Sequence, residues 1–193
     1  MPVSPSAPRP PKGDPRGARA AGVPEAALRG LAESKFVPRE RLKAVIERLK
    51  RQGRRVAFAN GCFDLLHVGH LRYLQGAKAA AGKNGVLVVA LNTDASVRKL
   101  KGPTRPLMTL KERAELVGAL ACVDYVTAFG EPTAGPTLRA LRPHLQAKGT
   151  DYTPESVPEA ALMRSLGGVV VITGDPKDHS TTALIAKVHK AFR

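Results

Sequence analysis

Short, continuously apolar runs alternate along this chain with longer segments in which apolar residues recur every three or four positions. A run that is apolar at every position is typical of a strand buried on both faces of a parallel sheet. These runs predict five strands, at residues 55–59, 85–91, 125–128, 144–147 and 169–172. The helical spacings predict helices at residues 38–52, 69–81, 111–121, 137–141, 156–166 and 181–192.

Strands that alternate with amphipathic helices indicate the α/β class. We expect a Rossmann-like, doubly wound parallel sheet of about five strands, covered by helices on both faces. Ligands of such sheets lie beyond the carboxyl ends of the strands. This rule places four polar loops around one rim of the domain, at residues 60–70, 92–105, 148–152 and 175–182.

The beginning of the chain has a different composition. Residues 1–30 lack a periodic apolar pattern and are rich in Pro, Ala, Gly and Arg. Such a segment buries too little apolar surface to offset its ordering entropy, so we predict a disordered basic tail. Residues 31–193 are expected to form one folded domain, in which a helix at 38–52 leads into a core at 54–192.

The formal net charge of the 193 residues is +15, and it is unevenly distributed. Residues 1–55 carry 14 Lys and Arg against 5 Asp and Glu, a net charge of +9. A basic balance attracts any anion, and a phosphate-rich substrate suffices to explain it in the folded part. Because only 4% of residues are aromatic, a basic nucleic-acid-binding protein is the less favoured alternative.

Cysteine content and hydropathy indicate the cellular compartment in which the protein is expected. Cys62 and Cys122 are the only cysteines, which suggests free thiols in a reducing environment. No apolar run approaches the roughly 20 residues of a membrane span, and no signal-peptide core is present. We therefore expect a cytoplasmic protein without membrane partners.

The most distinctive segment is NGCFDLLHVGH at residues 60–70, where a predicted strand passes into a predicted helix. His67 and His70 project from one turn at the start of that helix, where free N–H groups and the helix dipole favour an anion. Gly69 would let a phosphate approach the backbone closely. The pattern predicts a site that stabilises charge developing on a phosphoryl group.

Simpler interpretations of this segment stay open. The two histidines could form a metal pair or lie on the surface, although no nearby residues complete a zinc site. Cys62 could be a nucleophile, but phosphoryl transfer needs none, and a small buried thiol is the simpler interpretation. Asp64 fits a loop-structuring side chain or a weak metal ligand better than a base.

With its HVGH core, this segment resembles the HxGH signature of the cytidylyltransferase-like nucleotidyltransferase superfamily. HSTT at residues 179–182 resembles the second signature of that superfamily. Further segments are similar to the adenylyltransferase domain of bacterial ADP-heptose synthase: NTDAS at 92–96, LKG at 100–102 followed by RP at 105–106, GAL at 118–120 with VD at 123–124, and KGTDY at 148–152. The resemblance runs from about residue 36 to residue 189.

The resemblance implies transfer of AMP from ATP to D-glycero-β-D-manno-heptose 1-phosphate, giving ADP-heptose and pyrophosphate for the lipopolysaccharide core. It implies Mg²⁺ that arrives with ATP and is held mainly through phosphates, without a dedicated protein cage. Only about 55 residues precede the signature, so we expect the heptose kinase to be a separate pathway neighbour. A cytidylyltransferase acting on glycerol 3-phosphate or a similar alcohol phosphate is the alternative, and a homo-oligomer stays open.

The rim loops and the resemblance together assign three groups of site residues. The catalytic residues are expected to be His67, His70 and Lys101, with Lys101 on a loop. The acceptor is expected to contact Asn92, Asp94, Arg105 and Arg113, although Asp94 could instead cap a helix and Arg113 could form an ion pair. Ser180 could also be only a helix cap. The nucleotide is expected to contact Asn60, Gly61, Cys62, Phe63, Asp64, Gly69, Lys148, Gly149, Ser180, Thr181 and Thr182.

Because residues 1–24 are predicted to be dispensable, their deletion should leave the turnover number almost unchanged. The measurement compares pyrophosphate release by the full chain and the shortened chain at equal concentration. A collapse of the rate would contradict the prediction of a passive tail.

Overall fold

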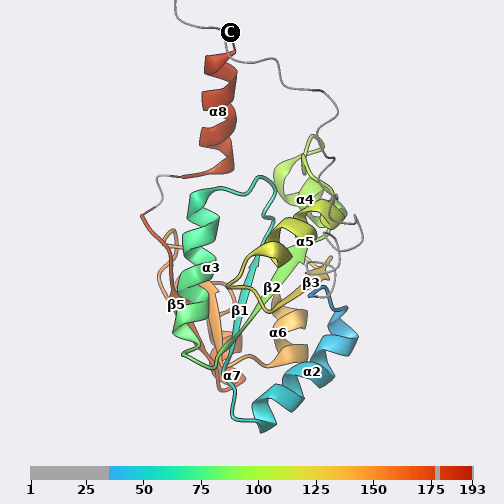
Figure 1. Ribbon diagram of the computed structural model, residues 1–193, viewed down its shortest axis with the longest axis vertical. Helices are drawn as coiled ribbons and strands as arrows, with labels where there is room; N and C mark the ends of the chain where they lie inside the picture. Colours follow the sequence, from blue (N-terminus) through green and yellow to red (C-terminus); the bar gives the residue numbers. More distant parts are fainter. Residues whose placement is uncertain (1–34, 177–178, 193) are drawn as a thin grey trace, which may run out of the picture.

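The computed structural model describes residues 35–176 and 179–192, and the tail expected at residues 1–30 lies outside them. The described chain contains one sheet of five parallel strands in the order β3-β2-β1-β4-β5 (Figure 1). The expected α/β sheet is therefore confirmed. The strands are β1 (Val56–Gly61), β2 (Val86–Asn92), β3 (Tyr125–Phe129), β4 (Leu145–Lys148) and β5 (Val169–Ile172).

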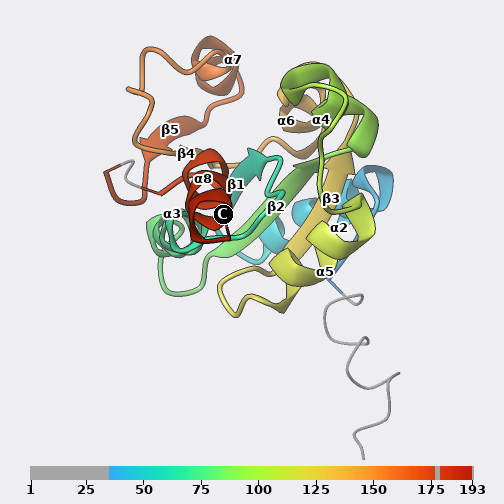
Figure 2. The same cartoon turned by 90° about the horizontal axis from the view of Figure 1, so that it is seen from above.

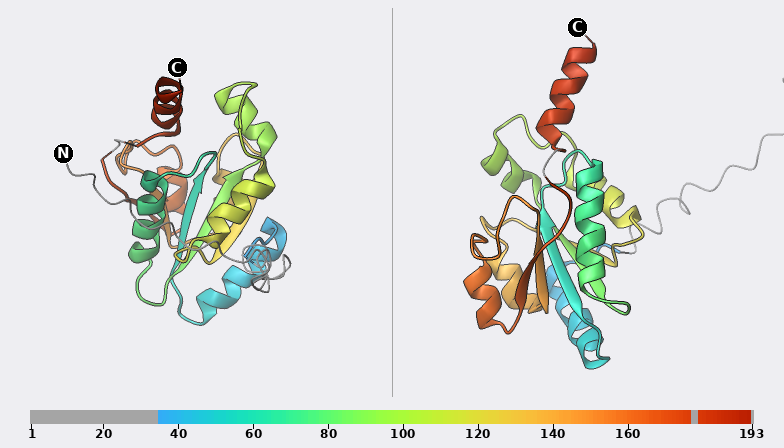
Figure 3. Two further views of the ribbon diagram at one scale, coloured as in Figure 1. Left: turned by 45° about the horizontal axis from the view of Figure 1, so that its top comes forward. Right: turned by 90° about the vertical axis from the view of Figure 1, so that its left-hand side faces the viewer.

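Helices cover both faces of the sheet, as Figures 2 and 3 show. Neighbouring side chains on a strand point to opposite faces. Ala57 and Ala59 of β1 therefore pack in one core with α3 (Val68–Ala80) and α5 (Leu110–Ala119). Val56 and Phe58 pack in a second core with α2 (Arg39–Arg51), α6 (Gly135–Leu141) and α7 (Ala160–Ser165). Burial on both faces of the sheet therefore explains why the strands are apolar at nearly every position.

The strand order creates a switch point beside β1. The chain runs outward from β1 through β2 to β3, and then returns to place β4 on the other side of β1. Connections that leave β1 and β4 turn in different directions, so a crevice opens between their carboxyl ends. The strand order alone therefore determines where this crevice lies.

One helix was absent from the sequence prediction, and another is shorter than predicted. α4 (Asp94–Lys101) begins at Thr93, whose hydroxyl accepts a hydrogen bond from the Ser96 N–H at 3.3 Å, and ends at Gly102 with φ 99°. Lys101 is therefore the last residue of a helix, and its expected position on a loop was wrong. α7 begins only at Ala160, four residues later than predicted, because Pro158 disfavours helical backbone at the preceding residue.

α8 (Thr181–Ala191) stands above the carboxyl end of the sheet (Figure 1) and contains no buried residue. Its first turn nevertheless lies close to the sheet, whereas its last turn points away. Within the described ranges, no helix is long and apolar enough to cross a bilayer.

His144 joins β1 to β4 at the opposite end of the sheet. Its Nδ1 accepts a hydrogen bond from the Val56 backbone N–H at 2.9 Å, which requires an unprotonated Nδ1. Burial lowers the pKa of His144, and the nearby Lys50 and Arg55 lower it further. The folded protein therefore favours the neutral ring.

Protonation of His144 should consequently destabilise the fold. The stabilisation is complete above the unfolded-state pKa of about 6.5 and is lost as the pH falls below it. The midpoint of thermal unfolding should fall less between pH 7.5 and pH 5 in His144→Gln, which retains an acceptor but does not titrate, than in the unaltered protein. Identical pH dependence in both proteins would contradict this.

Candidate active site

A cavity of about 600 Å³ opens at the carboxyl ends of β1 and β4. All four loops that the sequence placed around one rim contribute to its wall. Fifteen of the expected site residues line it: Asn60, Gly61, Cys62, Phe63, Asp64, His67, Gly69, His70, Lys101, Arg105, Lys148, Gly149, Ser180, Thr181 and Thr182. Asn92, Asp94 and Arg113 are absent from the wall.

The two histidines form a stacked pair at the tip of α3. His67 is the N-cap residue of that helix, and His70 lies in its first turn. Their ring centroids are 3.8 Å apart with an interplanar angle of 24°, and the buried ring of Phe63 lies 5.1 Å from His70. The Nδ1 atoms of both imidazoles are buried and have no hydrogen-bond partner in the described part of the chain.

The position of Gly69 is explained by the protein's own packing. A Cβ atom at this residue would lie 3.1 Å from His67 Nδ1 and 3.3 Å from the His179 Cβ. The space beside Gly69 therefore holds the imidazole of His67 and the segment that enters α8. A side chain at residue 69 would crowd these groups, which is a reason for glycine in addition to the predicted approach of a phosphate.

Both imidazoles are neutral near pH 7. Burial lowers the pKa of His70 to about 4, and the proximity of His67 contributes to that shift. The pKa of His67 is lowered by burial and by the nearby His179. A neutral imidazole can donate one N–H hydrogen bond without bringing the cost of a buried charge.

The tip of α8 reaches the same cavity from the far end of the sequence. Ser180 is its N-cap residue and accepts a hydrogen bond from the Ala183 N–H at 3.0 Å, so the capping role is present alongside a position in the cavity wall. The segment before it is fixed to α3. Arg72 forms a close ion pair with Asp175, and the Thr173 hydroxyl donates to the Tyr73 carbonyl at 3.1 Å.

Two cations approach the cavity from the other side. Lys101 and Arg105 line it, at the end of α4 and on the loop that follows. Arg105 Nε lies 2.5 Å from the buried carboxylate of Asp64, which also accepts the backbone N–H groups of Leu107 and Met108. Burial alone would raise the pKa of Asp64, but these three donors outweigh it and lower the pKa. Asp64 is thus an ionised anchor for the Arg105 loop.

Arg113 lies behind the cavity wall with no solvent exposure. Its guanidinium donates to the carbonyls of Met108, Cys62 and Asn92 at 3.1, 2.5 and 2.8 Å, and to Asp94 Oδ1 at 2.7 Å. The ion-pair interpretation of Arg113 therefore describes the structure, and the expected acceptor contact does not. Asp94 is a partner of Arg113 rather than a helix cap, because the capping side chain is that of Thr93.

A buried polar network supports the wall at the end of β4. Lys148 Nζ lies 3.2 Å from the Glu159 carboxylate and 5.5 Å from the centre of the Tyr152 ring. Gln146 Nε2 lies 3.4 Å from both Glu159 Oε2 and Asn60 Oδ1, so the network reaches from α7 to the end of β1. Since Lys148 and Glu159 are each only 8% exposed, the ammonium has a fixed position beside the cavity.

Several residues that line or support the cavity wall were outside the expected site. Glu159 and Gln146 support the wall from behind, and neither carries a motif that could have revealed this. His179 directly precedes the expected Ser-Thr-Thr segment and could have been included on that ground. The remaining additional wall residues are Tyr73, Val97, Thr150, Asp151, Tyr152, Thr173, Gly174, Asp175 and Pro176.

No protein-only metal site is formed by the described residues, among which no three His, Cys, Asp or Glu side chains cluster closely enough to bind an ion. Of the three carboxylates in the cavity wall, Asp64 is occupied by three donors and Asp175 by Arg72, and Asp151 also interacts within the protein. A cation in this cavity would therefore depend on oxygens brought by a ligand.

Comparison with known proteins agrees with this geometry. A profile of the cytidylyltransferase-like family matches residues 58–187, which is more than half of the chain. The chain belongs to this family. It is thus a nucleotidyltransferase, and the HxGH resemblance seen in the sequence is confirmed.

Curated relatives of this nucleotidyltransferase carry the name Bifunctional protein HldE. The protein from Syntrophotalea carbinolica is 47% identical over 156 residues, covering 81% of this chain and 31% of that protein. The protein from Pelobacter propionicus is 47% identical over 161 residues, covering 83% and 32%. The nucleotidyltransferase spans about a third of the length of these relatives.

Solved structures agree on the fold. The lipopolysaccharide core biosynthesis protein from Thermoplasma volcanium has a TM-score of 0.52 and 28% identity, over 62% of this chain and 94% of that chain. Pantoate-beta-alanine ligase from Francisella tularensis has a TM-score of 0.53 over 76% and 68% of the two chains. At 15% identity, the ligase shows a shared fold alone.

The first prediction from the site concerns Arg113. Arg113→Lys should lower the free energy of unfolding by about 2–4 kcal/mol, because one ammonium cannot satisfy the four acceptors that the buried guanidinium reaches. Urea denaturation measures this change. The matched control is Arg98→Lys on the exposed surface of α4, which should change stability little. An equal effect of both substitutions would contradict the role of Arg113.

The second prediction concerns Glu159. If Glu159 acts by positioning Lys148, Glu159→Gln should weaken nucleoside triphosphate binding on the order of tenfold. When Lys148→Met is already present, adding Glu159→Gln should weaken binding little further. Calorimetric titration of the two single variants and the double variant measures this coupling. Fully additive losses would show that Glu159 acts independently of Lys148.

Proposed function

We propose that this nucleotidyltransferase transfers AMP from ATP to D-glycero-β-D-manno-heptose 1-phosphate, giving ADP-heptose and pyrophosphate. The observation that carries the proposal is the single cavity shared by the stacked imidazoles of α3 and the hydroxyl-lined tip of α8. Its nucleotide-transfer chemistry follows from the family. The sugar phosphate is proposed from the similarity to the proteins named HldE and from the motifs at residues 92–106 and 148–152.

In the proposed reaction, an oxygen of the acceptor phosphate attacks the α-phosphorus of ATP. A new P–O bond forms as the bond from the α-phosphorus to the bridging oxygen breaks, and the electron pair leaves with pyrophosphate. The acceptor is already an anion, so the protein need not supply a nucleophile or remove a proton. Alignment of the two phosphates and stabilisation of developing charge are the main tasks.

The proposed roles follow the positions around the cavity. Neutral His67 and His70 donate N–H groups toward the α- and β-phosphates, and Ser180, Thr181 and Thr182 offer hydroxyls and backbone N–H groups to the terminal phosphates. Lys101 and Arg105 approach from α4 and the following loop, where the acceptor phosphate is proposed to bind. Lys148 and the backbone of Gly149 are proposed to contact the nucleotide.

We propose Mg²⁺ as the cation that accompanies ATP. The cavity fits an ion carried by the triphosphate, because its carboxylates already have protein partners while its cations and hydroxyls face the space for phosphate. When bound, Mg²⁺ would neutralise charge on the departing pyrophosphate. A sugar kinase must act before this enzyme, since the acceptor already carries its phosphate.

Pyrophosphate release with ATP or CTP, each combined with heptose 1-phosphate or glycerol 3-phosphate, tests the substrate assignment. The proposal expects the highest kcat/KM for ATP with heptose 1-phosphate. Preference for CTP with glycerol 3-phosphate would replace it with the cytidylyltransferase alternative. If none of the four combinations released pyrophosphate while nucleic acid bound in a salt-dependent manner, the non-enzymatic alternative would gain support.

Replacement of either His67 or His70 by Ala should lower kcat on the order of 10²- to 10³-fold with the fold intact. The physical reason is the loss of a preorganised donor beside the reacting phosphates. His189→Ala, on the exposed side of α8, is the matched control and should retain normal turnover. Near-normal kcat in either cavity variant, with circular dichroism unchanged, would remove that histidine from the mechanism.

A further inference from the structure

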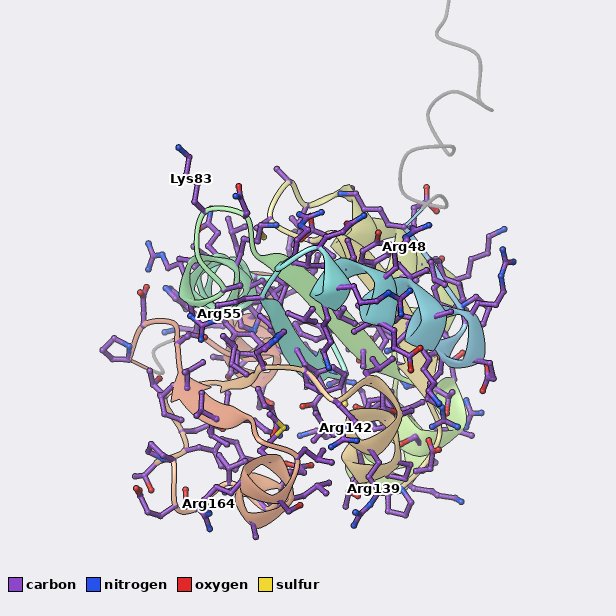
Figure 4. The ribbon with its side chains drawn as sticks, turned by 90° about the horizontal axis from the view of Figure 1, so that it is seen from below. Arg48, Arg55, Lys83, Arg139, Arg142 and Arg164 are labelled. Atoms are coloured by element: carbon purple, nitrogen blue, oxygen red, sulfur yellow. The ribbon has the colours of Figure 1, made fainter. Side chains whose placement is uncertain are left out.

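The end of the domain opposite the active site carries a broad basic surface. Figure 4 shows it from below, with cations from α2, the start of β1, the loop before β2, α6 and its following turn, and α7 spread across the whole face. We define the basic face by the labelled residues Arg48, Arg55, Lys83, Arg139, Arg142 and Arg164. All six are exposed, and each lies close to the amino end of a strand or at the carboxyl end of the helix before it.

These cations lack carboxylate partners. Among the described residues, none of the six forms an ion pair within 4.0 Å, whereas Arg39, Arg72, Arg105 and Arg113 elsewhere all do. Burial and the resulting positive potential both lower the pKa values of two neighbouring groups, Lys50 and His144. Burial and then Arg142 lower the pKa of Lys50, against an opposing effect of Glu47. The pKa of His144 is likewise lowered by burial and then by Lys50 and Arg55.

Complementation of helix dipoles accounts for only part of this charge. α2, α3, α6 and α7 end at this face, and cations in the last turn of a helix interact favourably with its dipole. Each helix end contributes roughly half a negative charge, so four ends offset about two of the six cations. Arg55 and Lys83 lie outside the helices and their caps, whereas Arg142 is the C-cap residue of α6. A positive surface therefore remains.

We infer that the basic face binds the surface of an anionic phospholipid membrane, a peripheral contact that differs from the absence of membrane partners expected from the sequence. The cations spread in two dimensions over one end of the molecule, which fits a plane of phosphate groups better than the narrow strip presented by a nucleic-acid duplex (Figure 4). The exposed Phe residues, Phe36 and Phe192, lie on other elements, so the face offers no ring for stacking nucleobases. Attraction to the negative surface of a bilayer is a property of such clustered Lys and Arg.

This orientation keeps the active site available. The cavity lies at the carboxyl ends of β1 and β4, whereas the basic face lies at the amino ends of the strands. A domain attached by the basic face would direct the cavity away from the membrane, where small phosphorylated substrates diffuse. Binding and turnover are therefore predicted to be separable, whichever nucleotide and acceptor the enzyme uses.

The test is sedimentation of the full chain with vesicles of phosphatidylcholine and phosphatidylglycerol in equal amounts, compared with phosphatidylcholine alone. We expect binding only to the anionic vesicles at about 0.05 M NaCl, and its loss at about 0.5 M NaCl. The variant Arg55→Gln, Lys83→Gln, Arg142→Gln, Arg164→Gln should bind on the order of tenfold or more weakly, with unchanged pyrophosphate release.

The matched control removes four exposed cations of α4, α5 and α8, which do not belong to the basic face: Arg98→Gln, Lys111→Gln, Lys187→Gln, Lys190→Gln. This control loses the same net charge as the basic-face variant. If vesicle binding depends on where the cations lie, the control should bind vesicles almost normally. Equal losses in both variants, or retained binding in the basic-face variant, would overturn the inference. So would absence of binding at low salt, or tighter binding to duplex DNA than to anionic vesicles at equal phosphate concentration.

Discussion

The buried guanidinium of Arg113 holds together the segments from which one side of the active site is built. It connects the end of β1, the end of β2, the first residue of α4 and the loop before α5 through four hydrogen bonds. A charge without solvent exposure is tolerable only when its donors are satisfied, so the arrangement of these loops is constrained by a single side chain. The loop that carries Arg105 is held at Met108 by both side chains: the Met108 N–H donates to Asp64, and its carbonyl accepts from Arg113.

On that support, the cavity combines neutral donors with fixed cations. The stacked imidazoles have lowered pKa values, so they approach a phosphate as dipoles, while full charges come from Lys101, Arg105 and Lys148 at the wall. Two of these cations have fixed partners, because Asp64 pairs with Arg105 and Glu159 pairs with Lys148. Such preorganisation reduces the reorganisation required when charge develops on the α-phosphate.

The two ends of the sheet differ in how their charge is balanced. At the carboxyl ends of the strands, cations are paired or face a cavity suited to phosphate. At the amino ends, six cations are exposed without carboxylate partners in the described chain. The net charge of +15 therefore has two separate structural origins besides the segment before residue 35.

The apolar runs and helical spacings determined the strand positions, the parallel sheet and the rim at which the loops meet, because burial on two faces leaves a periodic record in the chain. The NGCFDLLHVGH and HSTT segments likewise identified two helix tips. Sequence could not place Arg113, since a cation in a helix has the same local pattern whether it faces a ligand or a buried acceptor. Nor could it reveal Glu159, the His67 ring beside Gly69 or the unpaired basic face. Those depend on which side chains from distant segments meet, and only the tertiary structure decides that.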